Sequence, residues 1–457
     1  MRVLFLMMFW LGLPLVLIAQ SPAKREQKVV PYNYTIDDLP NGLRLITMPT
    51  DYPNLVALYI VVKTGSRNEV ELGKSGYAHL FEHMMFRGSQ NYTPEARDAI
   101  LKRAGASSNA YTSDDRTVYH EVFAKEDLDQ ILKMEADRFQ RLKYSSDVYR
   151  TETQAVLGEY NKNSANPFSK LYEKLREMAF DQHTYKHTTM GFLKDIEDMP
   201  NQYEYSLEFY RRYYRPEYTT IVLVGDVTQE RALQLVKQYF GDWQRGNYVP
   251  KIPTEPPQKA PRTAHVEWPA PTLPHLAVAF HGPAYSDEKK DKATLDLLAA
   301  IAFGENSDLY QRFVLKEQKV DLLTVAFDNK IDPELFTVFT RIKDAKDVEY
   351  VRDQILANVN RFTKELVPQT KLDATRSRLR YSAALAMNSS EAIAGALAPF
   401  IALRRTPATI DQLFALYERI TPAEIRAMAA QYLVDNQRII VTLTHEPRGK
   451  ENTGGKQ

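Results

Sequence analysis

The chain has 457 residues, with Lys+Arg 59 against Asp+Glu 58 and a net charge of +1 at pH 7. This length exceeds what one hydrophobic core usually serves, so we expect two or more domains. The balanced charge gives no electrostatic reason to expect nucleic acid as a partner. Cysteine is absent, which excludes disulfides, thiol nucleophiles and cysteine-ligated metals. Any metal must therefore be held by histidine and carboxylate side chains.

Residues 1–20 have the pattern of a secretory signal peptide. One positive charge at Arg2 precedes an uncharged, largely apolar run from Val3 to Ala19, which is short for a membrane-spanning helix and contains Pro14. Because no clean small-x-small cleavage site follows, an uncleaved N-terminal membrane anchor remains the alternative. Both interpretations predict export, and an exported protein without cysteine fits a bacterial periplasm.

The first part of the body predicts a strand and helix layer. Leu43–Thr47 and Leu55–Val62 have the composition of β-strands, and the second is apolar enough to be central in a sheet. The polar stretch Thr64–Glu69 ends the strand and leads to a helix around His79, which Gly88 closes. This order predicts an α/β or α+β fold.

The predicted helix carries a candidate metal site. His79 and His83 lie one turn apart on the same face, with Glu82 beside them. Two neutral imidazoles suit Zn²⁺, and Glu82 is placed to accept a proton from water without being a ligand. The order His-x-x-Glu-His is the reversed form of a known zinc pattern. By itself the pattern is weak, because histidine-rich helix faces also occur as packing surfaces.

A predicted hairpin follows over Ser107–Phe123. Its first strand is polar, the turn falls at Asp114 and Asp115, and its second strand is rich in β-branched and aromatic residues. A polar strand of this kind is typical of an exposed sheet edge, which can take up an extended peptide as an added strand. A solvated hairpin without a ligand explains the pattern equally well.

The segment Val148–Tyr160 has helical spacing, and Glu152 and Glu159 are two turns apart on one face. Solvated glutamates are common on helices, so neither residue indicates a site alone. Further along, Thr219–Asp226 predicts a buried strand, followed by a helix over Gln229–Tyr239.

Residues 245–261 contain five prolines and no periodicity, which predicts a stiff, extended linker. We expect this linker to separate a first half at 28–244 from a second half at 262–446. The remaining tail, 447–457, is polar and is expected to be disordered.

The second half repeats the pattern of the first. Leu276–Phe280 precedes a helix over Ala293–Ala302, as Leu55–Val62 precedes the helix around His79. The two halves also end alike: Phe209–Pro216 leads to the strand Ile221–Val224, as Met428–Leu433 leads to Ile439–Leu443. We therefore predict two homologous mixed α/β halves, each a sheet covered by helices. The helix of the second half contains no histidine, so only one half is expected to carry chemistry.

Taken together, these features resemble the pitrilysin-type (insulinase-like, inverzincin) zinc metallopeptidase family. The chain is similar to a shorter, bacterial-type member with one active and one degenerate half. The resemblance covers nearly the whole body of the chain and rests on His79–His83, Glu159 with Glu152 before it, Thr64–Glu69, Ser108–Thr112 and Gly225-Asp226.

The resemblance implies one Zn²⁺ per chain, with His79, His83 and Glu159 as its ligands. Glu82 would be the general base that activates a zinc-bound water, and Glu152 would support the ligands from behind. The implied activity is that of a zinc endopeptidase acting on short or unfolded peptides, in a clamshell chamber closed by two such chains. Asn109 and Ala110 resemble the residues that hold the backbone of the substrate.

The chain departs from the family at one point. Self-sufficient members carry an Arg and a Tyr, seven residues apart, in the second half, and Val314 and Asp321 stand at these positions here. Arg312 and Arg376 are substitutes by residue type only. We therefore expect a heterodimer, in which a homologous partner chain supplies the missing pair, rather than a homodimer.

Two alternatives remain open. Some family members only assemble complexes, so a non-enzymatic scaffold or assembly subunit is the second hypothesis, although such members usually lose part of the metal set. His183 and His187 form another pair four residues apart, but their neighbours favour a loop and no carboxylate lies between them. For this pair we expect a structural or substrate-proximal role rather than a second metal.

Overall fold

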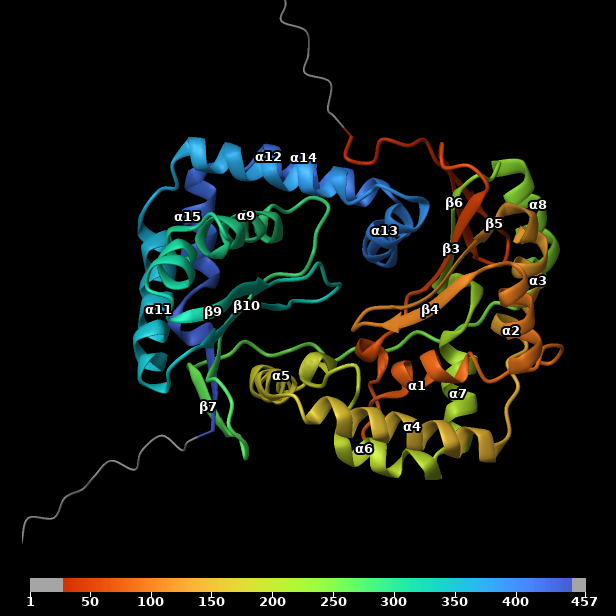
Figure 1. Cartoon of the computed structure of the whole chain (residues 1–457), viewed down its shortest axis with the longest axis horizontal. Helices are drawn as coiled ribbons and strands as arrows, with labels where there is room; N and C mark the ends of the chain where they lie inside the picture. Colours follow the sequence, from red (N-terminus) through yellow and green to blue (C-terminus); the bar gives the residue numbers. More distant parts are fainter. Residues whose placement is uncertain (1–27, 446–457) are drawn as a thin grey trace, which may run out of the picture.

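The protein contains two mixed β-sheets, each covered by helices (Figure 1). The structure is a computed structural model and describes residues 28–445. Figure 1 shows the first half on the right and the second half on the left, with a sheet in each. The predicted signal segment at 1–20 and the predicted tail at 447–457 lie outside the described residues. Within 28–445, none of the helices is both long and apolar enough to cross a membrane.

The first sheet has the strand order β1-β2-β6-β3-β5-β4, which leaves β4 at an edge. β2 and β6 are parallel, and the other neighbours are antiparallel. Its strands are β1 (Thr35–Asp38), β2 (Arg44–Pro49), β3 (Leu55–Val62), β4 (Ser107–Thr112), β5 (Thr117–Ala124) and β6 (Thr219–Gly225). The helices of this half are α1 (Tyr77–Met84), α2 (Pro94–Arg103), α3 (Leu128–Gln140), α4 (Ser146–Ser164), α5 (Pro167–Ala179), α6 (Leu193–Asp198), α7 (Tyr203–Tyr213) and α8 (Gln229–Phe240).

The second sheet has the order β7-β11-β8-β10-β9, with β7 and β11 parallel and the other neighbours antiparallel. Its strands are β7 (Arg262–Glu267), β8 (His275–His281), β9 (Val320–Ala326), β10 (Leu335–Ile342) and β11 (Arg438–Thr444). The helices are α9 (Asp291–Phe303), α10 (Asp308–Tyr310), α11 (Val348–Lys364), α12 (Gln369–Leu385), α13 (Ser390–Arg404), α14 (Ala408–Glu418) and α15 (Pro422–Tyr432). This order repeats β2-β6-β3-β5-β4, which confirms the predicted duplication. The extra strand β1 was not predicted.

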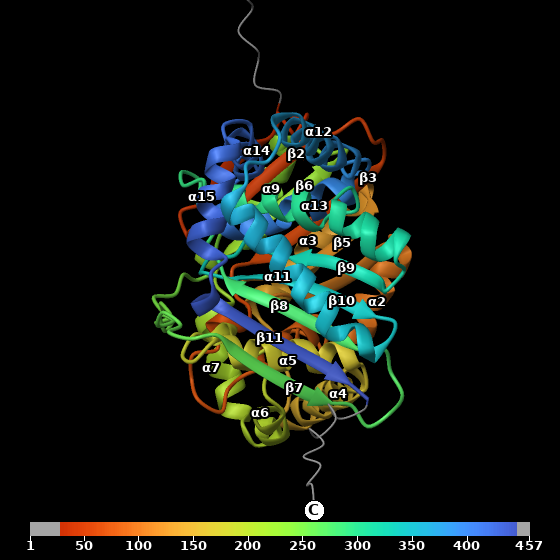
Figure 2. The same ribbon diagram turned by 90° about the vertical axis from the view of Figure 1, so that its left-hand side faces the viewer.

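In each half, part of the sheet is covered by a helix that belongs to the other half. α5, from the first half, packs on β7, β8 and β11, and α13, from the second half, packs on β3 and β6. Figure 1 shows α13 beside β3, and Figure 2 shows α5 close to β7 and β11. The buried Leu171 and Leu175 of α5 and Ile393 and Leu397 of α13 make these contacts apolar. The two halves therefore share their cores and cannot separate without exposing them.

Matching arginines fasten the exchanged helices. Arg44, the first residue of β2, donates to the carbonyl of Arg405 at the end of α13 (2.9 Å). Arg262, the first residue of β7, donates to the carbonyl of Met178 near the end of α5 (2.8 Å). Because the last carbonyls of a helix lack partners within the helix, these guanidinium groups satisfy them. The duplicated sheets thus use the same device in both halves.

A buried ion network joins the β4–β5 hairpin to the second half. Asp114, in the turn of the hairpin, pairs with Lys330 and lies 3.3 Å from the Arg176 guanidinium. The neighbouring Asp115 accepts hydrogen bonds from the Tyr185 hydroxyl (2.7 Å) and from the backbone N–H of Ile331 (2.9 Å). Pairing of this kind offsets the cost of removing a charge from water. The position of the edge strand β4 is consequently fixed by contacts that cross between the halves.

We predict that Leu397→Ala lowers the free energy of unfolding by about 2–5 kcal/mol, because it opens a cavity between α13 and the first sheet. Leu397 is fully buried, whereas Leu385 of α12 is 75% exposed, so Leu385→Ala is the matched control. Urea unfolding measures both variants. An equal loss in the two would contradict the shared core.

Candidate metal centre and peptide-binding edge

Helix α1 holds the two histidines of the predicted motif close to each other. Its apolar side chains pack against the first sheet, while the rings of His79 and His83 lie 4.8 Å apart between centroids. The helix begins after Gly76, whose φ of 91° is a left-handed conformation that suits glycine. Buried Glu69 accepts hydrogen bonds from the backbone N–H groups of Gly76 and Ala78, both at 2.7 Å. This carboxylate fixes the N-terminus of α1 and so orients both imidazoles.

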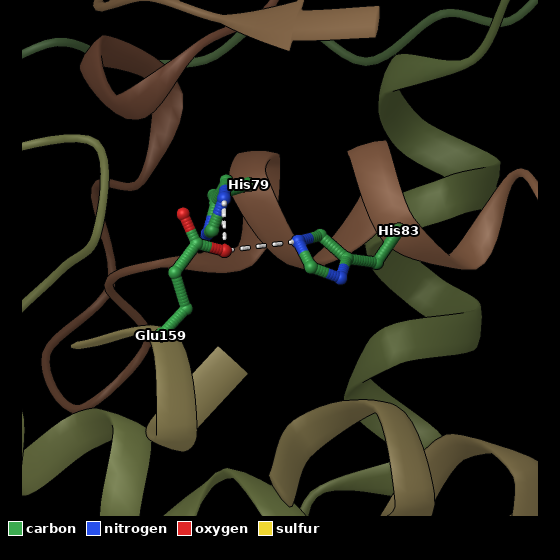
Figure 3. A group of neighbouring side chains, drawn as sticks. All are labelled: His79, His83 and Glu159. Carbon is green, nitrogen blue, oxygen red and sulfur yellow. Dashed lines mark ion pairs between the residues drawn. The ribbon is translucent and has the colours of Figure 1, made fainter. Parts of the chain in front are cut away.

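Helix α4 brings Glu159 to these histidines, as Figure 3 shows. One Glu159 carboxylate oxygen lies 3.6 Å from His79 Nε2 and 3.5 Å from His83 Nε2. The three residues can offer ligand atoms within 4.8 Å of one another, and no other such group occurs among residues 28–445. Two ligands at about 2.0–2.1 Å from one tetrahedral ion lie about 3.4 Å apart. The arrangement therefore fits a zinc ion with little movement of the side chains.

The protonation of the histidines also suits a metal. Burial lowers the pKa of His79 to about 4, with His83 adding to the effect, so its imidazole is neutral at pH 7. His79 Nδ1 is buried without a hydrogen-bond partner among the described residues. The nearby Glu152 carboxylate raises the pKa of His83, against the effect of burial. A histidine ligand must be neutral, so metal binding would displace a proton from His83 when it is charged.

Glu152 lies behind the cluster. One of its carboxylate oxygens is 3.6 Å from His83 Nδ1, and the other is 2.6 Å from Arg87 Nε. The Glu152 side chain is thus held between the unused nitrogen of one histidine and an arginine just beyond α1. A carboxylate in this position fixes the ring orientation and the tautomer of a metal-binding histidine.

Glu82 is held beside the cluster by the edge strand of the sheet. The Thr112 hydroxyl, at the end of β4, donates a hydrogen bond to the Glu82 carboxylate at 2.6 Å. Burial raises the pKa of Glu82, and the hydrogen bonds from Thr112 oppose that rise. A carboxyl pKa raised toward neutral pH is typical of a general base. The same contact ties the register of β4 to the position of Glu82.

The predicted substrate-binding residues lie on this edge strand. Asn109 is exposed, and its side-chain oxygen accepts a hydrogen bond from the backbone N–H of Ala110 (2.9 Å). Since β4 pairs with β5 on its other side, this N–H points toward the free edge. The described contacts do not join Asn109 or Ala110 directly to the histidine cluster.

The remaining sequence candidates do not reach the site. Arg312 bonds Gln354, and Arg376 pairs with Asp373 and with the carbonyl of Ile420, far along the chain from the cluster. At the positions where the family carries its Arg and Tyr, Val314 is partly buried against the core, and Asp321 of β9 pairs with Arg341 of β10.

The second histidine pair makes contacts of a structural kind. His183 lies 2.9 Å from the Asp332 carboxylate, and His187 Nδ1 lies 2.9 Å from the carbonyl of Thr188.

Glu69, Arg87 and Thr112 were not assigned roles from sequence. Glu69 stands within the predicted loop Thr64–Glu69, but its capping role depends on a contact that no periodic pattern reveals.

Comparison with known proteins identifies the family. Residues 45–192 match the family model described as "Insulinase (Peptidase family M16)", and residues 202–379 match "Peptidase M16 inactive domain". The chain belongs to the M16 peptidase family. This confirms the predicted family and its fold of two related halves. The inactive-domain model falls mainly on the second half, whose helix lacks histidine.

Several relatives span nearly the whole chain. "Zinc protease PqqE" of Helicobacter pylori is 28% identical over 448 residues, covering 95% of this chain and 98% of that protein. The beta subunit of mitochondrial-processing peptidase from Saccharomyces cerevisiae is 23% identical and covers 88% of each chain. A crystal structure of a Helicobacter pylori protease has a TM-score of 0.84 at 26% identity, covering 90% of this chain and 99% of that one. The names of these relatives are those of proteases or of a protease subunit.

We predict that Glu69→Ala lowers the free energy of unfolding by at least about 2 kcal/mol, because it leaves the buried backbone N–H groups of Gly76 and Ala78 without an acceptor. Glu197→Ala, at an exposed position of α6, is the matched control. Urea unfolding and zinc titration measure the two variants. If the Glu69 variant keeps the stability and zinc affinity of the control, the capping role is wrong.

Proposed function

We propose that this protein is a zinc-dependent endopeptidase that hydrolyses short or unfolded peptides. The observation that carries the proposal is the cluster of His79, His83 and Glu159, whose ligand atoms lie at separations suited to one ion. Three protein ligands leave a coordination position for water, as a catalytic zinc site requires. The names of the zinc protease relatives support the same metal.

A zinc ion held by His79, His83 and Glu159 would supply a Lewis acid that lowers the pKa of water and polarises the scissile carbonyl. Glu82 accepts the proton of the attacking water and returns it to the leaving amine. Thr112 holds the Glu82 carboxylate at hydrogen-bond distance, so the base stays in place through both transfers. Glu152 supports His83 from the opposite side, and Arg87 holds Glu152.

The edge strand β4 would hold the substrate. An extended peptide can pair with the free backbone groups of an edge strand, and a folded protein cannot present such a segment. The Ala110 N–H would then exchange its contact with Asn109 for one with the peptide backbone. Because Thr112 of the same strand contacts Glu82, a peptide added to β4 would pass beside the base.

We further propose that the working enzyme is a heterodimer. Neither Val314 nor Asp321 can donate hydrogen bonds to the developing oxyanion as an Arg and Tyr pair would. A homologous partner chain would supply these groups and close the chamber. The resemblance to a beta subunit of a processing peptidase supports this assembly. We also propose export to a bacterial periplasm, in keeping with the N-terminal sequence and with a structural neighbour titled as a periplasmic protease.

The second candidate is a non-enzymatic scaffold or assembly subunit, favoured by the match of the second half to an inactive-domain model. The retention of three metal-binding side chains and of Glu82 favours the enzyme. Within the proposal, 28–244 is the zinc-bearing half and 262–446 is the degenerate half, with 245–261 as their linker.

Replacing Glu82 by Gln is expected to lower peptide cleavage by about 10²–10⁴-fold, because the proton acceptor is lost. The variant should keep one zinc per chain by elemental analysis, whereas Glu159→Gln should lose zinc affinity. Glu126→Gln, at an exposed surface position, is the control. Undiminished cleavage by the Glu82 variant would exclude this residue as the base.

Purified alone, the chain should bind zinc yet cleave a peptide mixture slowly, since the oxyanion donors are missing. Co-purification from the native host should yield a homologous second chain that raises the cleavage rate at least tenfold, about 1.4 kcal/mol of barrier. Full activity of the isolated chain would contradict the heterodimer, and zinc binding without activity in either form would favour the scaffold.

A further inference from the structure

The face of the first sheet opposite α1 carries an aromatic row that ends at the edge strand. Tyr59 of β3 stacks on His120 of β5 with ring centroids 4.9 Å apart, and Tyr111 of β4 lies 6.3 Å from the same imidazole. Side chains alternate along a strand, so Tyr111 faces away from Thr112 and Glu82. A strand added to β4 would place alternate side chains beside Tyr111, on the face opposite the metal cluster.

Arg116 has no anionic partner on this face. Its guanidinium lies over the Tyr111 ring, 5.7 Å from the centroid, and its Nε is buried without a hydrogen-bond partner. Within the described part of the chain, no carboxylate lies at ion-pair distance from it. The neighbouring Arg67 and Arg176 are paired, with Asp332 and Asp114 respectively. An unpaired, half-buried guanidinium is costly unless a ligand completes its bonding.

Lys63 adds a second unpaired cation. The last residue pair between β3 and β5 is Val62 with Thr117, so Lys63 and Arg116 each lie one residue beyond the same end of this ladder. The Lys63 ammonium likewise forms no ion pair among residues 28–445. Burial lowers its pKa, with Arg67 adding to the effect, so a nearby anion would stabilise its charged form. Asp115, the carboxylate that acts on it, is already bonded by Tyr185 and Ile331.

We propose that Arg116 and Lys63 form a carboxylate-binding subsite that selects acidic peptides. The proposal rests on β4 receiving the substrate as an added strand. Thr112 sets the position of Glu82 along β4, and Tyr111 is the next residue on the opposite face. A peptide residue beside Tyr111 is therefore adjacent in sequence to one facing Glu82, close to the bond to be cut. Its carboxylate would meet the Arg116 guanidinium over the Tyr111 ring, with Lys63 further from the edge strand.

The carboxylate could belong to a Glu or Asp side chain or to the C-terminus of the peptide. Glu391, at the start of α13, acts on Tyr59 and His120 further along the row, so the cationic character is confined to the hairpin end. A substrate with its negative charge near the scissile bond and no charge further along fits this distribution.

The test measures peptide affinity in a Glu82→Gln background, so that binding is read without hydrolysis. Fluorescent peptides of one sequence carry Glu, Gln or Lys at each position in turn, with an amidated C-terminus. A further Gln peptide carries a free C-terminal carboxylate. We expect the best Glu peptide, or the free-carboxylate peptide, to bind about tenfold more tightly than its amidated Gln counterpart. The peptide that gains affinity identifies the source of the carboxylate. If neither the Glu peptides nor the free-carboxylate peptide bind more tightly than the amidated Gln peptide, the subsite is overturned.

Variants assign the effect to the two cations. Arg116→Gln and Lys63→Gln should each reduce the preference to about threefold or less, and Arg116→Glu should favour the Lys peptide. Arg103→Gln, an exposed position on α2 with the same change of charge, should keep the tenfold preference. Thermal unfolding checks that the variants fold, and Lys63→Gln serves if an Arg116 variant does not. A preference that survives both substitutions overturns the proposal.

Cleavage of the neutral peptide by the unmodified zinc-loaded protein, alone and with its partner, tests the proposed function separately. If this peptide is cut while acidic peptides have no advantage in binding, the subsite is wrong and the peptidase stands. If nothing is cut but the acidic preference is present and lost in Arg116→Gln, the subsite stands and the peptidase is wrong.

Discussion

The reciprocal exchange of helices α5 and α13 is the constraint on which the rest of the structure depends. Each sheet has one face covered by its own helices and part of the other covered by a helix from the opposite half. Burial of these apolar surfaces drives the two halves together, and the paired arginines Arg44 and Arg262 fix the ends of the exchanged helices. The chain is therefore one unit, although its sequence is a duplication.

This constraint positions the edge strand and, through it, the candidate site. The β4–β5 hairpin is fixed at its turn by Asp114 and Asp115, which reach residues of the second half. At the end of β4, the Thr112 hydroxyl donates a hydrogen bond to Glu82. The second half thus contributes to the site indirectly, by holding the strand that aligns the proposed base.

Charge is distributed unevenly around the proposed peptide path. Most buried cations are paired, as Arg176 and Lys330 are with Asp114. Arg116 and Lys63 are exceptions, since neither forms an ion pair among residues 28–445. Both lie just beyond the same end of the β3–β5 ladder, near the turn of the β4–β5 hairpin. Unpaired buried charge persists in a fold when function requires it, since pairing would raise stability at the cost of ligand affinity.

The sequence by itself determined the features that local periodicity encodes. The spacing of His79, Glu82 and His83 placed them on one helix face, the two-turn spacing of Glu152 and Glu159 aligned their carboxylates, and the repeated strand and helix pattern revealed two related halves. The resemblance joined the two helices into one hypothetical site, and the structure brings their side chains together.

Only the tertiary structure decided which distant groups meet. The helix exchange, the capping of α1 by Glu69, the support of Glu82 by Thr112 and the lack of a partner for Arg116 all depend on contacts between segments far apart in the chain. Such contacts leave no periodic signal, because the partner of a side chain is set by packing and not by its neighbours in sequence. Local order follows from residue spacing, whereas pairing between distant groups requires the folded chain.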